Sequence, residues 1–304
     1  MNKKNCIHCG SPITVKNGLN KGRQLYKCHA CGRQFLGGRR KNAHDIFDEY
    51  FYGKQTYAQL TEKYGCSEKT IRRYIDKVNP RRKTDFGRVA NAVMDTTYFG
   101  KEFGVMVFKN TLDGCVLLTK FVSHETVKGY LDGISEIVSR GISVQSIICD
   151  GKKGVVNAFA DIPVQTCQFH QIKTVTTYLT RKPKLQASIE LRILSLCLTD
   201  ITKEEFNSRL DRWFEKWKHV LNEWTINEET GKSHYTHKKL RSAYRSLVTN
   251  LPHLFVFEEW RELDIPNTTN SLDGLFADLK NKLRNHNGLS TSRKKKLIDE
   301  FFKA

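Results

Sequence analysis

Two aspartates stand at positions where carboxylates can do metal chemistry. Asp95 lies at the end of an apolar, strand-like run, and Asp150 ends a second apolar run further along the chain. Carboxylates at the ends of neighbouring strands can lie side by side, where they can hold divalent metal ions for phosphoryl transfer. The sequence therefore predicts a divalent-metal site built around Asp95 and Asp150.

Four cysteines near the N-terminus form two Cys-x-x-Cys pairs that are separated by eighteen residues. Four thiolates at this spacing are typical of a closed tetrahedral zinc site, which can stabilise a domain too small to have its own core. We therefore predict a zinc ribbon over residues 1–40, with short strands at 24–27 and 33–36. The predicted ligands of its single structural zinc ion are Cys6, Cys9, Cys28 and Cys31.

The elements around the two aspartates have a recognisable order. Three strand-like runs, separated by short turns that contain glycine, predict an antiparallel meander. A helix with one apolar face follows, and then a buried strand that ends at Asp150. This order predicts an α/β, ribonuclease-H-like catalytic core, whose first elements are residues 92–99, 103–108, 115–122, 127–138 and 144–149.

The second half of the chain returns to this core after a long insertion. A short helix at 152–159 and a strand at 164–170 are predicted first, and the strand runs into a helix. Residues 184–262 are predicted to be an all-α insertion, so the core comprises residues 91–183 and 263–304. A helix with a leucine stripe then begins near Asn270. Asp273 either forms a capping box with Asn270 as N-cap or supplies a third metal ligand.

Residues 43–79 predict a helix-turn-helix DNA-binding domain, with Ser67 as the N-cap of its second helix. A helical hairpin that only links two domains is the alternative. Residues 80–90 form a basic linker. The side chains predicted to contact DNA are basic or polar and lie in the ribbon, the second helix and the linker: Arg23, Lys27, Arg33, Arg39, Arg40, Lys69, Thr70, Arg72, Arg73, Arg81 and Arg82.

The charge is strongly positive and unevenly distributed. The formal net charge is +19, and residues 1–90 alone carry 20 Lys and Arg against 7 Asp and Glu. Concentrated positive charge indicates a polyanionic partner such as nucleic acid. The sequence contains neither a long apolar run nor the apolar core of a signal peptide, so we expect a cytoplasmic protein without membrane contact.

Four short motifs in a fixed order carry a resemblance to a known family. They are Asp95-Thr96-Thr97, Cys149-Asp150-Gly151, Cys167-Gln168-Phe169-His170 and Thr268-Thr269-Asn270-Ser271-Leu272-Asp273-Gly274. Together they resemble the DDE transposases of bacterial insertion sequences, in particular the Mutator-like group with an N-terminal zinc ribbon. The resemblance covers nearly the whole chain.

The resemblance assigns expected roles to several residues. Asp95, Asp150 and Asp273 are the expected catalytic acids, although the third acid of the family is usually Glu, and Glu262 and Asp264 are alternatives. Cys167 and His170 are either a buried thiol with a hydrogen-bonded histidine or direct participants in catalysis. Asn270 is a further expected neighbour of the site.

The resemblance also implies an activity. The chain is expected to bind the terminal inverted repeats of a mobile element and its target DNA, as a dimer or higher oligomer on DNA, in the bacterial nucleoid. Two Mg²⁺ or Mn²⁺ ions in each active site are expected to support strand cleavage and strand transfer. Two alternatives stay open at this point: a DNA-binding regulator with an inactive catalytic fold, and a metal-dependent nuclease that does not join strands.

Overall fold

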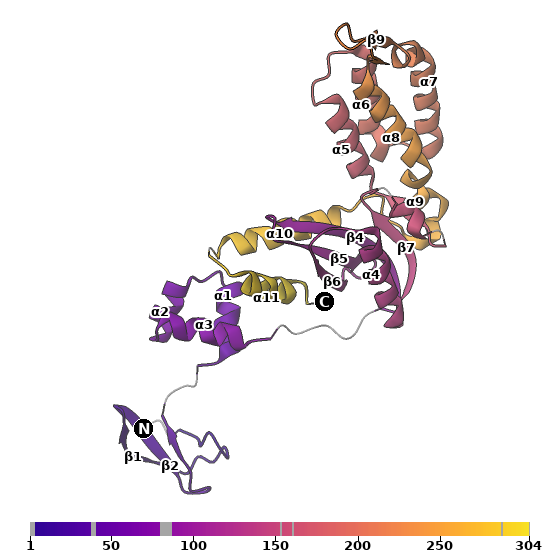
Figure 1. The fold of residues 1–304 in the computed structure, drawn as a ribbon. Helices are drawn as coiled ribbons and strands as arrows, with labels where there is room; N and C mark the ends of the chain where they lie inside the picture. Colours follow the sequence, from indigo (N-terminus) through magenta and orange to yellow (C-terminus); the bar gives the residue numbers. More distant parts are fainter. Residues whose placement is uncertain are drawn as a thin grey trace. The chain divides into compact units, whose positions relative to one another are not determined.

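The computed structural model divides the chain into two compact units, residues 1–79 and 80–304 (Figure 1). Four of the predicted DNA contacts, Arg39, Arg40, Arg81 and Arg82, lie outside the described residues. No helix in the described part of the chain is both long and apolar enough to cross a membrane. The structure describes residues 4–37, 41–79, 87–152, 154–159, 161–286 and 288–303.

The first unit begins with a small three-stranded antiparallel sheet of β1 (Thr14–Asn20), β2 (Arg23–Cys28) and β3 (Gln34–Leu36). The two predicted strands are thus present, and β1 is an additional one. The buried core of this sheet is very small and consists of Cys6, Cys28 and Phe35, with Tyr26 stacked on Phe35 at 5.6 Å between ring centroids. So little apolar burial cannot stabilise an isolated ribbon, which agrees with a need for a metal.

Three helices follow in the same unit: α1 (Ala43–Phe51), α2 (Tyr57–Tyr64) and α3 (Glu68–Lys77). A capping box between Thr56 and Gln59 starts α2, and Gly65 ends it with a left-handed φ of 55°. Ser67 is the N-cap of α3, as predicted, although its side chain makes no capping hydrogen bond. The predicted order of helix, glycine turn and helix is therefore present.

The second unit is built on a five-stranded mixed sheet with the order β6-β5-β4-β7-β8. The first three strands in sequence pair antiparallel, whereas β7 lies parallel to β4 and β8 lies parallel to β7. This strand order is that of the predicted ribonuclease-H-like core. The strands are β4 (Val89–Phe99), β5 (Phe103–Asn110), β6 (Val116–Val122), β7 (Ser143–Cys149) and β8 (Val164–Thr166).

Helices cover both faces of the sheet and create two apolar layers. On one face, α4 (Val127–Ser139) and the short 3₁₀ helix η1 (Val156–Phe159) share a core with the sheet. At Gly133, a Cβ atom would lie 2.1 Å from the Phe108 ring, so only glycine lets α4 approach the sheet this closely. On the other face pack α10 (Asn270–Arg284) and α11 (Thr291–Phe302).

The segment between β8 and α10 contains the predicted insertion, residues 184–262, and its apolar core also includes residues of α5, which precedes that range. Its helices lie alongside one another in Figure 1. The prediction of a wholly helical segment was wrong, because β9 (Trp224–Ile226) and β10 (Ser233–Tyr235) form a hairpin there. The other elements are α5 (Gln168–Leu179), α6 (Gln186–Leu196), η2 (Cys197–Thr199), α7 (Lys203–Leu221), α8 (Lys238–Leu254), α9 (Val256–Glu259) and η3 (Arg261–Leu263).

The predicted strand at 164–170 was also too long. The strand β8 ends at Thr166, Cys167 is the N-cap of α5, and the next three residues form the first turn of that helix. This turn is fixed by contacts with distant segments. The backbone N–H of Gln168 donates to the carbonyl of Asn267, and the Gln168 side chain donates to the carbonyl of Leu254. The start of α5 is therefore tied to the C-terminal part of the insertion and to the chain that follows it.

Candidate active site

Asp95 lies within the central strand β4, and Asp150 directly follows β7, the strand parallel to β4. Strands β4 and β7 run parallel with Val93 opposite Ile148, and each aspartate lies two residues beyond its paired residue. The Oδ1 atom of Asp95 accepts the N–H of Thr96 at 2.6 Å, and Oδ1 of Asp150 accepts the N–H of Lys152 at 2.9 Å. Asp150 directly follows the end of β7, as predicted, but the prediction that Asp95 ends its strand was wrong, because β4 stays paired with β5 as far as Phe99.

Asp273 joins this site from the first turn of α10, where it is exposed. One ligand atom each from Asp95, His170 and Asp273 lie within 4.8 Å of one another, a grouping that can hold a metal ion. The ligand atoms of Asp150 are not part of this set, although the charge of Asp150 acts on Asp95. The sequence analysis expected Asp95, Asp150 and Asp273 to be the catalytic acids. It left the role of His170 open.

The N-terminus of α10 differs from the expected capping box. Its N-cap is Thr269, which makes no side-chain capping hydrogen bond, and Asn270 is already the first helical residue. The prediction of Asn270 as N-cap was therefore wrong. The hydroxyl of Thr269 is engaged elsewhere, because it lies 3.4 Å from the Cys167 sulfur and 3.3 Å from Nδ1 of His170.

Cys167 and His170 are in contact with the segment that carries Asp273. The Cys167 sulfur is buried and also accepts the backbone N–H of Thr269 at 3.2 Å. Burial opposes ionisation of this thiol, but hydrogen bonds with His170 and Thr269 lower the pKa of Cys167 overall. The hydrogen bond with Cys167 raises the pKa of His170, and the Asp95 and Asp273 carboxylates add to that shift. The Cys-x-x-His pair thus links the start of α5 to the start of α10.

Glu262 and Asp264, the alternative third acids, belong to a segment attached to the other end of β4. The side-chain amide of Asn91 donates to the carbonyls of Leu263 and Asp264 at 2.6 and 3.2 Å. Asn91 lies four residues before Asp95, a separation of about 13 Å along a strand. Neither alternative belongs to the group of ligand atoms around Asp95 in the described part of the chain.

Sequence reasoning missed a hydrogen-bonded chain that connects the surroundings of Asp95 and Asp150. The Thr96 hydroxyl lies 3.1 Å from the Tyr130 hydroxyl, and the Tyr130 hydroxyl donates to Glu125 at 2.7 Å. Glu125 in turn forms an ion pair of 2.9 Å with Lys152, the residue whose backbone binds Asp150. Only the tertiary structure reveals this chain, because its members lie on three separate segments.

Removal of the Tyr130 hydroxyl should weaken the second unit. Burial raises the pKa of Tyr130, so the group stays protonated and donates to Glu125. The substitution Tyr130→Phe should lower the free energy of unfolding by about 1–3 kcal/mol, because Glu125 loses a donor in a half-buried place. Urea denaturation measures this, with Tyr178→Phe on the exposed side of α5 as the control. Equal midpoints for the two variants would contradict the assigned hydrogen bond.

The electrostatics of the site make Asp95 costly to ionise. Burial raises the pKa of Asp95 to about 6, with Asp150 and Asp273 adding to the shift, while the Thr96 N–H and His170 oppose it. The folded state binds this proton more tightly than the unfolded state does. The free energy of unfolding therefore falls as the pH rises from 3.8, the ordinary pKa of the group, to about 6. Above that range, the folded protein carries the full cost of this charge.

The substitution Asp95→Asn should therefore stabilise the protein when no divalent cation is present. A pKa shift of about two units corresponds to about 2–3 kcal/mol above pH 6, and the gain should vanish towards pH 4. Urea denaturation across this pH range in zinc-containing, magnesium-free buffer measures the effect. The exposed Asp273→Asn variant, expected to change stability by less than about 0.5 kcal/mol, is the control. A gain that does not depend on pH would refute the electrostatic origin.

The four cysteines of the ribbon form a separate cluster. The sulfurs of Cys6 and Cys31 are 3.6 Å apart, and those of Cys9 and Cys28 are 3.7 Å apart. Ligands of a tetrahedral zinc ion at 2.3 Å are separated by about 3.8 Å. Each Cys-x-x-Cys pair is followed by a glycine with left-handed φ, 75° at Gly10 and 70° at Gly32, as a tight turn at a sulfur ligand requires. The cluster has the donor set and spacing of a zinc site.

Most of the predicted DNA contacts that the structure describes are exposed. Arg23, Lys27 and Arg33 are exposed in the ribbon, and Lys69 and Arg73 are exposed on α3. Arg72 is already engaged, since its guanidinium pairs with Glu68 and lies 4.5 Å from the centroid of the Tyr57 ring. Thr70 is half-buried and lies beside the Ser67 hydroxyl at 3.1 Å.

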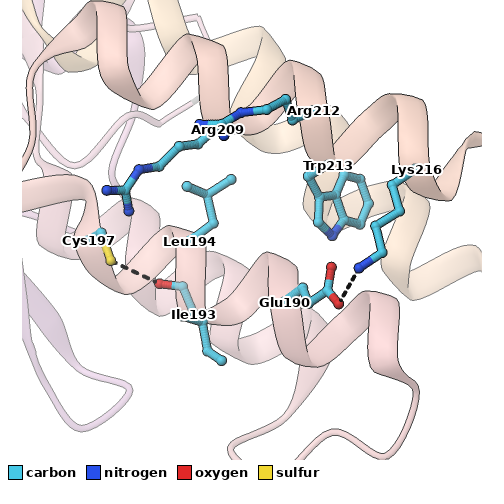
Figure 2. A pocket seen from close by; sticks show the side chains of 8 residues that line it. All are labelled: Glu190, Ile193, Leu194, Cys197, Arg209, Arg212, Trp213 and Lys216. Atoms are coloured by element: carbon cyan, nitrogen blue, oxygen red, sulfur yellow. Dashed lines mark hydrogen bonds and ion pairs between the residues drawn. The ribbon is translucent and has the colours of Figure 1, made fainter.

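The active site and the insertion each border a cavity in the second unit. The one at the active site, about 660 Å³, extends from His170 and Asp273 along α5. The other, about 490 Å³, lies between α6 and α7 in the insertion (Figure 2). Its wall includes Arg209, Arg212 and Trp213, and Figure 2 shows its Glu190 paired with Lys216. Among the described residues that line this cavity, Glu190 is the only carboxylate.

Three comparisons relate the chain to known proteins. Residues 113–251 match the family model described as transposase, Mutator family, which is a little under half of the chain. No curated protein sequence matches it. The match spans β6 and β7, and therefore Asp150, as well as the Cys-x-x-His motif and most of the insertion.

Several solved structures are similar at low identity. The Drosophila P element transposase strand transfer complex has 12% identity and a TM-score of 0.45, over 88% of this chain and 93% of that chain. A simian T-cell lymphotropic virus intasome in complex with the PP2A regulatory subunit B56 gamma has 12% identity and a TM-score of 0.22, over 66% and 68%. The HTLV-2 integrase catalytic core domain in complex with magnesium has 13% identity and a TM-score of 0.22, over 53% and 97%.

With TM-scores this low, the fold assignment depends on the strand order of the sheet itself. The family match covers the second aspartate, the Cys-x-x-His motif and most of the helical insertion in one continuous segment. It agrees with the order of motifs along the chain and with the gathering of Asp95 and Asp273. Over residues 113–251, the chain is similar to transposases of the Mutator family.

Proposed function

We propose that this protein is a transposase of the Mutator family that binds the ends of a bacterial insertion sequence and carries out metal-dependent cleavage and transfer of DNA strands. Asp95, Asp150 and Asp273 are its catalytic acids. The observation that carries the proposal is the gathering of Asp95 and Asp273, which are 178 residues apart in sequence, within 4.8 Å of each other, with Asp150 directly after the strand parallel to that of Asp95.

The donor set fits divalent cations. Carboxylate oxygens are the ligands that Mg²⁺ and Mn²⁺ prefer, and His170 adds a nitrogen donor that suits Mn²⁺ better than Mg²⁺. When bound, two such ions would activate an attacking hydroxyl or water and stabilise the charge on the leaving oxygen. The three aspartates hold the cations and set their position relative to the DNA phosphate. Cys167 and Thr269 hold α10, and therefore Asp273, against the start of α5.

The first unit supplies DNA binding in this proposal. The ribbon, held by one zinc ion on its four cysteines, and the helix-turn-helix present exposed Arg23, Lys27, Arg33, Lys69 and Arg73 to the terminal repeats. Two ends must be held together for transfer, so the active form on DNA is a dimer or larger assembly. The separation of binding from catalysis predicts that loss of a metal ligand leaves end binding intact.

The decisive experiment incubates the wild-type chain with a labelled duplex that carries the element's own end, a target plasmid, and Mg²⁺ or Mn²⁺. The expected result is metal-dependent release of a 3′-hydroxyl end, followed by its covalent joining to the target. Cleavage without joining under all conditions would favour a nuclease on the same fold. Specific binding to the end with no cleavage in either metal would favour a regulator and overturn the proposal.

A further inference from the structure

The exposed side of α5 carries side chains that the chemistry of the carboxylates does not use. This helix starts at the active site and runs into the insertion (Figure 1). Its buried residues, Gln168, Gln171, Val175 and Leu179, are spaced by three or four and fix it against the insertion. The opposite side is therefore held in place and left open to solvent.

That open side has an aromatic ring at one end, one cation in its second turn and a second cation just past the end of the helix. Phe169 has 53% of its surface exposed in the first turn, directly beside His170. Lys173 follows one helical turn later and is exposed, and Arg181 is exposed just beyond the end of the helix. Thr176, Thr177 and Thr180 add hydroxyl groups between the two cations.

These residues line one cavity together with two residues of the active site. The cavity of about 660 Å³ is bounded by this side of α5 and by His170 and Asp273. Among the described residues that line it, Asp273 is the only carboxylate. A ligand in this cavity therefore meets the metal-binding carboxylate at one end and positive charge at the other. From Phe169 to Thr180 the helix extends about 16 Å, the length of a few nucleotides.

We propose that this side of α5 is a track for a short single-stranded segment of DNA next to the bond that is cut, an inference that rests on the proposed function. An unpaired base stacks on Phe169, and Lys173 and Arg181 bind the phosphates that follow it. An exposed aromatic ring can stack on a base only where the base is unpaired, because in a duplex the neighbouring base pairs already cover its two faces. The threonine hydroxyls and the two cations contact the backbone, which carries the same chemistry in every sequence.

The track is tested by photo-crosslinking with the full-length, zinc-loaded chain. A single-stranded oligonucleotide with iodouracil at one position is bound in buffer without Mg²⁺ or Mn²⁺, irradiated, and the modified peptide is identified by mass spectrometry. The expected product is a crosslink at Phe169. It should be retained in Phe169→Trp and lost in Phe169→Ala, while Tyr178→Ala, on a neighbouring part of α5 outside the cavity, should leave it unchanged.

The phosphate contacts are tested with charge-matched pairs of substitutions. The double variant Lys173→Gln/Arg181→Gln should make the slope of log affinity against log salt concentration shallower by about 1.4 for single-stranded DNA. The double variant Lys182→Gln/Lys184→Gln removes the same charge from exposed residues outside the cavity and should alter the slope much less. Thermal unfolding confirms that both fold.

The outcomes separate this inference from the proposed function. Crosslinks found only in residues 1–79, or equal slopes for the two double variants, would overturn the track even if wild-type protein cuts and joins DNA. A crosslink at Phe169 in a protein that never cuts the element's end would support the track and count against the proposed reaction. Because crosslinking omits the divalent cation, its result does not depend on catalysis.

Discussion

Substitution of any one of the three acids by asparagine should reduce cleavage of the element's end by at least about a thousandfold. In the proposed reaction each acid would supply negative charge for the cations that stabilise the transition state, and a loss of about 4 kcal/mol of that stabilisation corresponds to this factor. Asp95→Asn, Asp150→Asn and Asp273→Asn should all bind the labelled end with wild-type affinity, because the proposed function assigns that binding to the first unit. Gel shift and cleavage assays on the same preparations measure both quantities.

The third acid has its own matched controls. Glu262→Gln and Asp264→Asn change the two acids that lie close to Asp273 in sequence, on the segment that contacts Asn91. Both variants should keep near wild-type cleavage. Asp273→Glu tests the reach of the side chain, since a longer carboxylate on the same turn should restore part of the activity that asparagine removes. Full activity in Asp273→Asn, with none in Glu262→Gln, would assign the third ligand to Glu262 instead.

Loss of zinc should unfold the ribbon and leave the second unit intact. The ribbon core is only three buried side chains, two of which are cysteines of the cluster. Zinc binding in such domains contributes about 10–16 kcal/mol, and that binding energy is the folding energy. Cys28→Ser should therefore remove most of the bound zinc and expose the amides of residues 4–37 to hydrogen exchange. Residues 87–303 should exchange as in the wild type.

Cys66→Ser is the control for this experiment, because Cys66 is a partly buried cysteine outside the cluster. It should keep the zinc and the wild-type exchange pattern. Zinc content by mass spectrometry and hydrogen exchange by peptide together give the result. A ribbon that stays protected in Cys28→Ser without zinc would refute a metal-stabilised fold, and a loss of protection in both units would show that they depend on each other.

Much of the fold follows from local properties of the sequence. The alternation and apolar runs of β4 to β7, with glycines in the turns, depend on neighbouring residues and predicted the order of the sheet correctly. The Cys-x-x-Cys spacing predicted the cysteine cluster for the same reason. The glycine turn and the helix after Ser67 are likewise set within a few residues. Such features need no knowledge of distant segments.

The elements that were mispredicted all depend on distant contacts or weak local signals. The first turn of α5 looked like the end of a strand, but its backbone is bound by Asn267, 99 residues away. Asn270 looked like an N-cap, yet Thr269 takes that position while its hydroxyl faces Cys167 and His170. The hairpin β9–β10 is made of two strands of three residues each, too short for periodicity to detect.

The sequence by itself determined the types of the chemical groups and the strands that carry two of them, because alternation and spacing are local. Only the tertiary structure decided which groups meet. It brought His170 and Asp273 to within 4.8 Å of Asp95, and it tied Glu125, Tyr130 and Lys152 into one chain. Contacts between segments over a hundred residues apart are formed when the insertion and α10 pack against the sheet, and no short window of sequence contains that packing.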